Sequence, residues 1–265
     1  MLIAPQPSPY DLQFSVLGFP VRVSWTFWLM GAVLGWGWSQ GMDAFAIHQS
    51  IDTPGAGVML LIWIFCVFLS ILVHELGHAL AWRRYGQNAH IVLYHFGGLA
   101  INDSMSSWDG ARRHRTSAVE DLVVSAAGPL AQLALALVVW TVGLAIQMPM
   151  DLTRWINSLG ADLPYGTADT IALYGLFDAL LWTSTAWAIL NLAPIFPLDG
   201  GQILMSLLTM SNVDQPRRTA HLVSAVLGGL LGFFLMTSGQ SMAGLMFVML
   251  AVNNWQQMQD GRGIY

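Results

Sequence analysis

The stretch GVMLLIWIFCVFLSILVHELGHALAW, residues 57–82, is almost entirely apolar and carries a single charged residue, Glu75. A helix of about 20 apolar residues crosses the roughly 30 Å hydrocarbon core of a bilayer, so this stretch is long enough to span a membrane. Two histidines and a glutamate are costly inside such a helix and normally mark a functional site. The stretch therefore predicts a membrane helix that carries chemistry.

The rest of the chain has the same apolar character. Of its 265 residues, 55% are hydrophobic and only 9% are charged, which is too little charge for a soluble globule. Apolar runs predict about six transmembrane helices, at residues 23–38, 57–82, 122–146, 170–192, 222–237 and 242–255. We therefore expect an all-α polytopic membrane protein, a helix bundle in which residues 1–265 form a single membrane domain.

The arginines predict how the helices are oriented. All ten basic residues are arginine, and cytoplasmic loops collect positive charge. With the N-terminus inside, nine of the ten fall on the cytoplasmic side and only Arg154 falls outside, so both termini are expected to be cytoplasmic.

Residues 1–10 lack the pattern of a secretory signal and are expected to form a short arm. Nucleic-acid binding has no basic patch to rest on, and the single cysteine, Cys66, excludes an intrachain disulfide.

Two stretches do not fit simple membrane helices. HIVLYHFGGLAIND, residues 90–103, is β-branched and aromatic around two glycines, which predicts a strand, a bend and a second strand. Its backbone groups cannot face lipid, so this re-entrant β-hairpin must be covered by protein or line a wet cavity. In NLAPIFPLDGG, residues 191–201, two prolines end the fourth helix. A short helix over about residues 200–210 is expected to follow.

The motif His74-Glu75-Leu76-Gly77-His78 predicts a metal site. Residues four apart on a helix share a face with Cβ atoms about 5–6 Å apart, so both imidazoles can bind one Zn²⁺. Glu75 can then reach a water molecule in the metal's open position. From this composition the pattern is expected by chance only about 0.0014 times.

A catalytic zinc takes three protein ligands, so one more is needed. The strongest candidate is Asp199, which follows the proline break at the cytoplasmic end of the fourth helix. His78 lies five residues before Arg83, at the cytoplasmic end of the second helix. The two side chains are therefore expected at a similar depth, about 7–10 Å below the inner surface.

These motifs together resemble the site-2 protease family of intramembrane zinc metalloproteases. The histidine motif, the Asn191–Gly200 stretch, Ser125-Ala-Ala-Gly128-Pro129 and Phe96-Gly97-Gly98 resemble family elements, within a shared three-helix core over about residues 57–210. The helices at 23–38, 222–237 and 242–255 lie outside this core. The chain looks like a compact member without a PDZ or CBS domain, and a bacterial plasma membrane is its expected location.

The resemblance implies specific roles for individual residues. One Zn²⁺ per chain would be bound by His74, His78 and Asp199, and Glu75 would be the general base. Asn191 and Pro197 would help to hold the substrate's backbone extended beside the metal. The expected reaction is hydrolysis of a peptide bond in a single-span membrane protein, near the cytoplasmic face.

Further expectations come from the residues themselves. The strand edge around Gly97 and Gly98 offers a place where an unwound substrate can pair. His90 and His95 are open candidates for the site, whereas Asp178 is expected to face the bundle interior, satisfied by a neighbouring helix. The alternative function is a zinc-binding transporter or metal sensor without peptidase activity. The oligomeric state and any regulatory membrane partner stay open.

Overall fold

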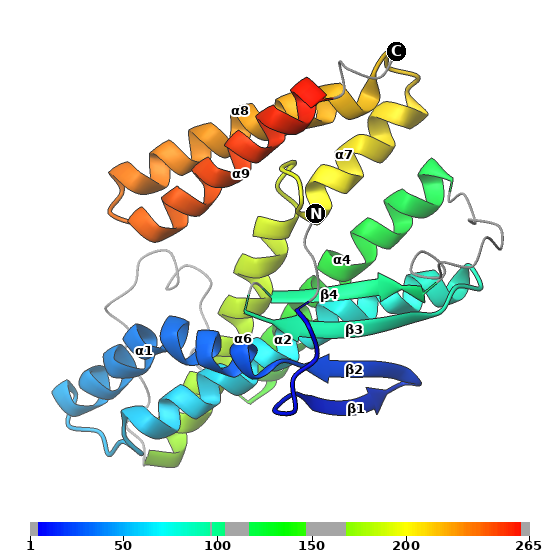
Figure 1. Ribbon diagram of the computed structural model, residues 1–265. Coiled ribbons are helices and arrows are strands. Elements are labelled where there is room, and N and C mark those ends of the chain that lie inside the picture. The colour runs from blue at the N-terminus through cyan, green and yellow to red at the C-terminus, as the bar shows by residue number, and fades with distance from the viewer. Residues whose placement is uncertain (1–4, 96, 104–116, 147–167, 261–265) are drawn as a thin grey trace.

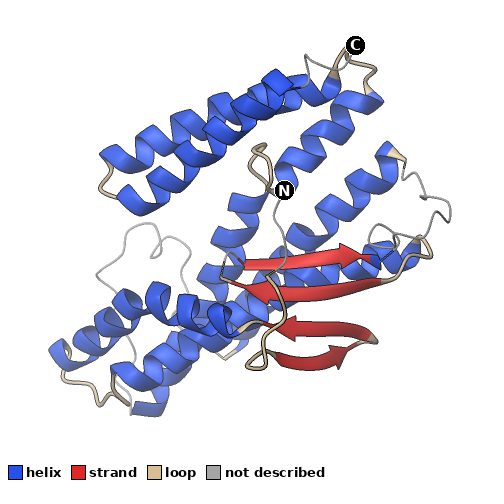
Figure 2. Cartoon of the chain, in the orientation of Figure 1, coloured by secondary structure: helices blue, strands red, loops and turns tan. Residues whose placement is uncertain are grey.

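The computed structural model describes residues 5–95, 97–103, 117–146 and 168–260, which form helices and one small sheet (Figures 1 and 2). The strands are β1 (Leu12–Val16), β2 (Phe19–Val23), β3 (Ala89–Tyr94) and β4 (Gly97–Asn102). The helices are α1 (Trp25–His48), α2 (Ala56–Arg84), α4 (Ala118–Ala145), α6 (Ala168–Asn191), α7 (Asp199–Met210), α8 (Pro216–Thr237) and α9 (Ser241–Asp260).

Helices form at all six predicted positions, and the short helix after the second proline forms as α7. Among the described residues, four helices are long and apolar enough to cross a membrane: α2, α4, α8 and, within α6, Ile171–Asn191. The count of six spans therefore stays a prediction, since α1 and α9 are not among these four. The arginines at 112, 113, 115, 154 and 262, on which the predicted orientation partly depends, and Phe96 lie outside the described residues.

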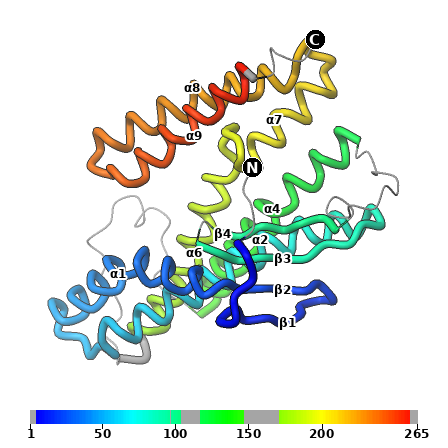
Figure 3. The backbone as a smooth tube through the Cα atoms, viewed as in Figure 1, coloured from blue at the N-terminus to red at the C-terminus, as the bar shows by residue number. Residues whose placement is uncertain are grey.

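Helix α2 is the centre of the packing around the motif. It contacts α1, α4 and α6, and α4 in turn contacts α7. Helices α2 and α4 approach closely at Gly77, where an added Cβ would lie 2.5 Å from the Ala127 carbonyl oxygen. Helices α8 and α9 pack against each other as an antiparallel hairpin, which Figure 3 shows joined to the rest of the chain through α7.

The sheet has the strand order β1-β2-β3-β4. The predicted hairpin over residues 90–103 is confirmed as antiparallel β3 and β4, with Ile91 opposite Ala100. The all-α expectation is incomplete, because a second hairpin precedes the first helix and β2 pairs in parallel with β3, placing Val21 beside Ile91. The sequence analysis missed this hairpin, although Phe19, Val21 and Val23 alternate with more polar residues as half-buried strands do.

One face of the sheet packs on the turn of α2 that precedes the motif. Val21, Val23, Ile91 and Leu93 are buried in a cluster that includes Ile71 and Leu72 of α2. Both β3 and β4 contact α2 directly. This packing lays the β3–β4 hairpin along the helix that carries His74, Glu75 and His78.

Candidate metal centre

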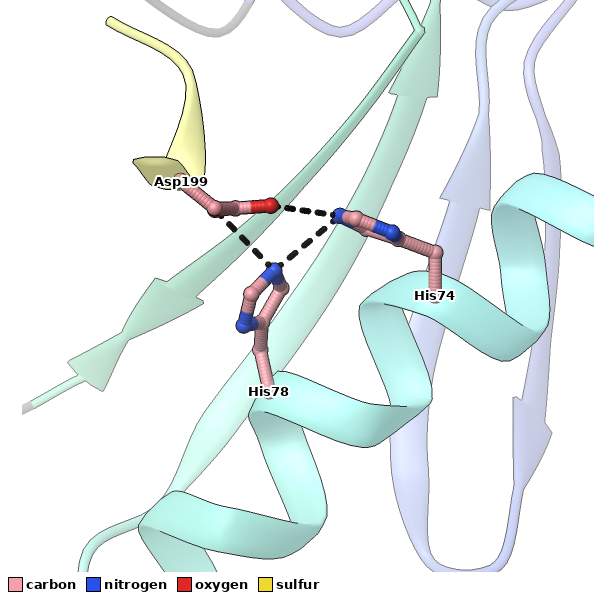
Figure 4. A group of neighbouring side chains, drawn as sticks. All are labelled: His74, His78 and Asp199. Carbon is pink, nitrogen blue, oxygen red and sulfur yellow. Dashed lines mark hydrogen bonds and ion pairs between the residues drawn. The ribbon is translucent and has the colours of Figure 1, made fainter. Parts of the chain in front are cut away.

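Three side chains from two helices converge on one point (Figure 4). His74 and His78 lie one turn apart on α2, and Asp199 is the first residue of α7. His74 Nε2 lies 3.0 Å from Asp199 Oδ2, and His78 Nε2 lies 3.4 Å from Asp199 Oδ1. The two histidine Nε2 atoms are 3.1 Å apart. Within the described part of the chain, this is the group of three residues whose ligand atoms can surround one metal ion.

Hydrogen bonds at the Nδ1 atom of each histidine determine whether its Nε2 atom carries a proton or a lone pair. His74 Nδ1 lies 3.0 Å from Gln132 Oε1, and His78 Nδ1 lies 2.7 Å from the Val124 carbonyl oxygen. Both partners are acceptors, so each Nδ1 carries the proton and donates it. In the neutral ring, Nε2 then presents a lone pair toward the other Nε2 and toward the carboxylate.

This donor set fits a zinc ion. Two imidazole nitrogens and a carboxylate oxygen are the ligand types that Zn²⁺ binds in three-ligand catalytic sites. A metal ligand must be deprotonated, and the Asp199 carboxylate supplies the negative charge that two neutral imidazoles lack.

Gln132 on α4 is a residue of this site that the sequence analysis missed. Its side chain is fully buried and contacts His74 on one side, while its Nε2 donates to Ser70 Oγ at 2.7 Å. Ser70 Oγ lies 3.1 Å from Ser184 Oγ of α6, so three helices share the chain of hydrogen bonds. A signal was available, because a glutamine in the middle of an apolar span is costly and normally functional.

Glu75 lies beside the three converging residues and is held by strand β4. Its Oε2 accepts the backbone N–H of Ala100 at 2.8 Å, and the residue is only 5% exposed. At Gly98, an added Cβ would collide with the Glu75 carboxylate. Gly98 therefore leaves room for the glutamate, a role not foreseen from the sequence.

A second glycine makes room for a ligand. An added Cβ at Gly128 of α4 would collide with the His78 ring. This glycine belongs to the Ser125–Pro129 element that resembled the family's middle core helix. The close approach of α4 to His78 also lets the Val124 carbonyl accept its hydrogen bond.

The remaining predicted residues have defined positions. Asn191 is the buried last residue of α6, and Pro197 lies two residues before Asp199. Gly97 begins β4 with a φ of 121°, which favours glycine, and packs near Trp187. Their roles with substrate stay predictions.

The two open candidates, His90 and His95, and the buried acid Asp178 have partners away from the three converging residues. His90 pairs with Asp103 at 2.6 Å, and His95 Nδ1 lies 3.2 Å from Thr26 Oγ1, so neither belongs to the converging group. Asp178 on α6 accepts the indole N–H of Trp38 on α1 at 3.2 Å. The expectation of an acid satisfied by a neighbouring helix is thereby confirmed.

The sequence and the fold of this chain are similar to those of known proteins. A sequence model of peptidase family M50 matches residues 62–235. A putative zinc metalloprotease of Synechocystis sp. is 32% identical over 199 residues, which are 73% of this chain and 42% of that protein. A zinc metalloprotease of Methanocaldococcus jannaschii is 26% identical over 197 residues, which are 74% of this chain and 44% of that protein.

The match therefore covers less than half the length of both relatives. Among solved structures, the site-2 protease from Methanocaldococcus jannaschii aligns over 97% of both chains at 20% identity with a TM-score of 0.47.

Proposed function

This chain belongs to peptidase family M50, the family of the site-2 proteases, and on that premise we propose that it is an intramembrane zinc endopeptidase. It hydrolyses a peptide bond in a single-span membrane protein near the cytoplasmic face. The observation that carries the proposal is the convergence of His74, His78 and Asp199, with Glu75 beside them on α2. Four helices apolar enough to cross a bilayer support the membrane setting.

The proposed chemistry assigns a role to each of the four side chains. His74, His78 and Asp199 would hold one zinc ion, which would supply Lewis acidity for the hydrolysis of the peptide bond. Glu75 takes a proton from the attacking water and returns it to the departing amine nitrogen. The N–H of Ala100 keeps the Glu75 carboxylate in place for both transfers.

The edge of β4 supports a mode of substrate binding. Ala100 faces Ile91 of β3, but its N–H points away from β3 and toward Glu75. Among the described strands β4 ends the sheet, so a peptide pairing with it would run beside the catalytic glutamate. Gly97 and Gly98 contribute no side chains of their own at this end of the edge, where Trp187 and Glu75 lie close by. Asn191 and Pro197, by family resemblance, hold the substrate's backbone on the opposite side.

The proposal extends to the setting of the enzyme. The catalytic core comprises about residues 57–210, and the helices outside it contact lipid and any regulatory partner. Nine of ten arginines support cytoplasmic termini in a multi-pass protein of a bacterial plasma membrane.

The alternative function is a zinc transporter or metal sensor that uses the same three ligands. Such a protein has no need of a carboxylate held next to the ligands by a backbone hydrogen bond. Glu75 is buried, bonded to Ala100 and given room by Gly98, which favours the peptidase.

The test measures zinc content and cleavage of a single-span reporter by the purified chain in detergent. Glu75→Gln is expected to retain about one zinc per chain and to lose about 10²–10⁴-fold in cleavage rate. Glu120→Gln is the matched control, because Glu120 lies half-buried in the first turn of α4, where its capping role tolerates glutamine. A reporter cleaved equally by wild type and Glu75→Gln would overturn the peptidase and favour the alternative.

A further inference from the structure

The loop that carries Asp199 into the metal centre is held from its other side by the α8–α9 hairpin. Residues 192–198 join α6 to α7, and Phe196 lies three residues before Asp199. We propose that Ser224 of α8 and Asn254 of α9 are positioning residues that set the place of Asp199 through Phe196. The inference rests on the proposed zinc site and adds to it a mechanical connection with a separate pair of helices.

Both backbone groups of Phe196 are bonded to the hairpin. Its N–H donates to Ser224 Oγ at 3.0 Å, and its carbonyl oxygen accepts from Asn254 Nδ2 at 2.7 Å. Two side chains from two different helices thus hold the peptide groups on both sides of Phe196. This arrangement fixes where the backbone of Phe196 lies relative to the hairpin.

The two holding side chains are themselves buried and oriented. Ser224 is 0% exposed and donates to the Ala220 carbonyl at 2.8 Å, whereas Asn254 is 2% exposed. Asn254 also donates to the Leu250 carbonyl at 2.8 Å, and its Oδ1 lies 2.8 Å from Nδ1 of His221. Every polar atom of the asparagine amide therefore has a partner, which leaves it one orientation.

His221 adds a packing contact with the side chain of Phe196. Its ring lies over the Phe196 ring, with centroids 4.9 Å apart and planes 32° from parallel. The side chain of Phe196 is therefore held by α8, while its backbone is held by both helices.

The segment between Phe196 and Asp199 is packed tightly enough to transmit this position. The Leu198 N–H donates to the Ile195 carbonyl at 2.9 Å, and the Gly201 N–H donates to the Leu198 carbonyl at 3.0 Å. An added Cβ at Gly201 would lie 2.6 Å from the Phe196 nitrogen. The first turn of α7 thus packs directly against the backbone of Phe196. A shift of Phe196 therefore moves Asp199 with it.

Asn254 also lies outside the part of the chain that the family comparison covers. The M50 match ends at residue 235, within α8, whereas α9 begins at Ser241. The contact of α9 with the loop therefore lies outside the residues that the family model matches. It makes the metal geometry depend on the position of α9.

The experiment measures the zinc affinity of the purified full-length chain by competition with a chelator. Asn254→Asp keeps the size of the side chain and its contact with His221 but removes the donor to Phe196, and Ser224→Ala removes the acceptor. Each is expected to weaken zinc binding about 10-fold, the lower end of the range for a residue bonded directly to a metal ligand, because each acts on Asp199 through Phe196. Asn253→Asp, an exposed neighbour on α9, is the matched control and is expected to bind zinc as wild type does.

A double-mutant cycle separates positioning from general loosening of the fold. In an Asp199→Ala background, Asn254→Asp is expected to cause no further loss of zinc affinity. An undiminished loss in that background, or wild-type affinity in both single variants, would overturn the proposal. If Asn254→Asp does not elute as a folded species, Ser224→Ala takes its place in the cycle.

The cycle also distinguishes this proposal from the proposed function. Wild-type zinc affinity in Asp199→Ala alone would overturn the metal site itself, and with it the positioning of Asp199. Zinc binding that follows the expected pattern in a chain that cleaves no reporter would uphold the positioning and count against the peptidase.

Discussion

The backbone N–H of Ala100 donates to Glu75 Oε2 at 2.8 Å, so a strand of the sheet holds the proposed general base. Gly98, two residues earlier on the same strand, leaves the space that the carboxylate occupies. The β3–β4 hairpin therefore acts on the chemistry through Glu75 as well as offering an edge to a peptide. This dual role links the position of β4 to the orientation of the base.

Gly98→Ala is expected to slow cleavage about 10²-fold, because the new methyl group displaces the Glu75 carboxylate and a misplacement of about 1 Å has this effect. The zinc content should stay at the wild-type level, since the three atoms nearest an added Cβ at Gly98 all belong to Glu75 and not to a proposed zinc ligand. Parallel measurements of reporter cleavage and bound zinc check both statements. Gly57→Ala is the control, because an added Cβ there meets nothing within 4 Å.

Gln132→Leu is expected to weaken zinc binding about 10–100-fold, because the ring of His74 loses the acceptor that orients it. Gln132→Glu keeps an acceptor at the same place and should bind zinc more tightly than Gln132→Leu. Chelator competition measures both, with Gln257→Leu on the exposed side of α9 as the control. Equal affinities for the leucine and glutamate variants would contradict an orienting role.

Zinc should stabilise the folded chain through its three ligands. A ligand that binds only the folded state at 100 times its Kd adds about 2.7 kcal/mol to the free energy of unfolding. The melting temperature of wild type is therefore expected to rise with zinc and to fall when a chelator removes it. His78→Ala should lose this response, whereas His48→Ala, an exposed residue, should keep it. A response that survives in His78→Ala would place the metal elsewhere.

The N-terminal hairpin should be less stable in acid. Asp11 pairs with Arg22 of β2 at 2.9 Å. Burial of the carboxyl opposes ionisation, but hydrogen bonds from the Ser8 N–H and from Arg22 lower its pKa below the ordinary 3.8. A carboxyl with a depressed folded pKa stabilises the fold above its unfolded pKa, and this stabilisation is lost as the pH falls through the folded value.

Asp11→Asn is therefore expected to lower the melting temperature at pH 7, with a difference from wild type that shrinks below about pH 4. Thermal unfolding across pH measures this, and Asp52→Asn, an exposed acid, serves as the control. A difference that is constant from pH 7 into the acid range would show that the carboxylate charge contributes nothing.

The metal centre was largely predictable because its signals are local. His74 and His78 are four residues apart on one helix, and Asp199 follows a proline break at a matching depth. Spacing and depth therefore predicted that the three side chains lie close together. The structure places their ligand atoms within 4.8 Å of one another. Their roles with zinc stay predictions, as do those of Asn191, Pro197 and Gly97 with substrate.

The parts that escaped prediction depend on contacts between distant segments. Strand β2 is stable as a partner of β3, and no local feature of the sequence around Val21 predicts that it lies beside Ile91. Asn254 appears as a polar residue at the end of an apolar helix, and its contact with Phe196 arises only when the hairpin folds back. Gln132 could have been found, since its burial cost within an apolar span is visible in the sequence.

Because β2 pairs in parallel with β3, β2 is synthesised well before the strand with which it pairs. The chain between Val21 and Ile91 contains all of α1 and α2. The β1–β2 hairpin therefore cannot pair with β3 until both helices have been made. Pairings so distant in sequence form slowly, since the loop must close before any contact rewards it. The β3–β4 hairpin that holds Glu75 is local in sequence, whereas the full four-stranded sheet is completed only when the distant β1–β2 hairpin joins it.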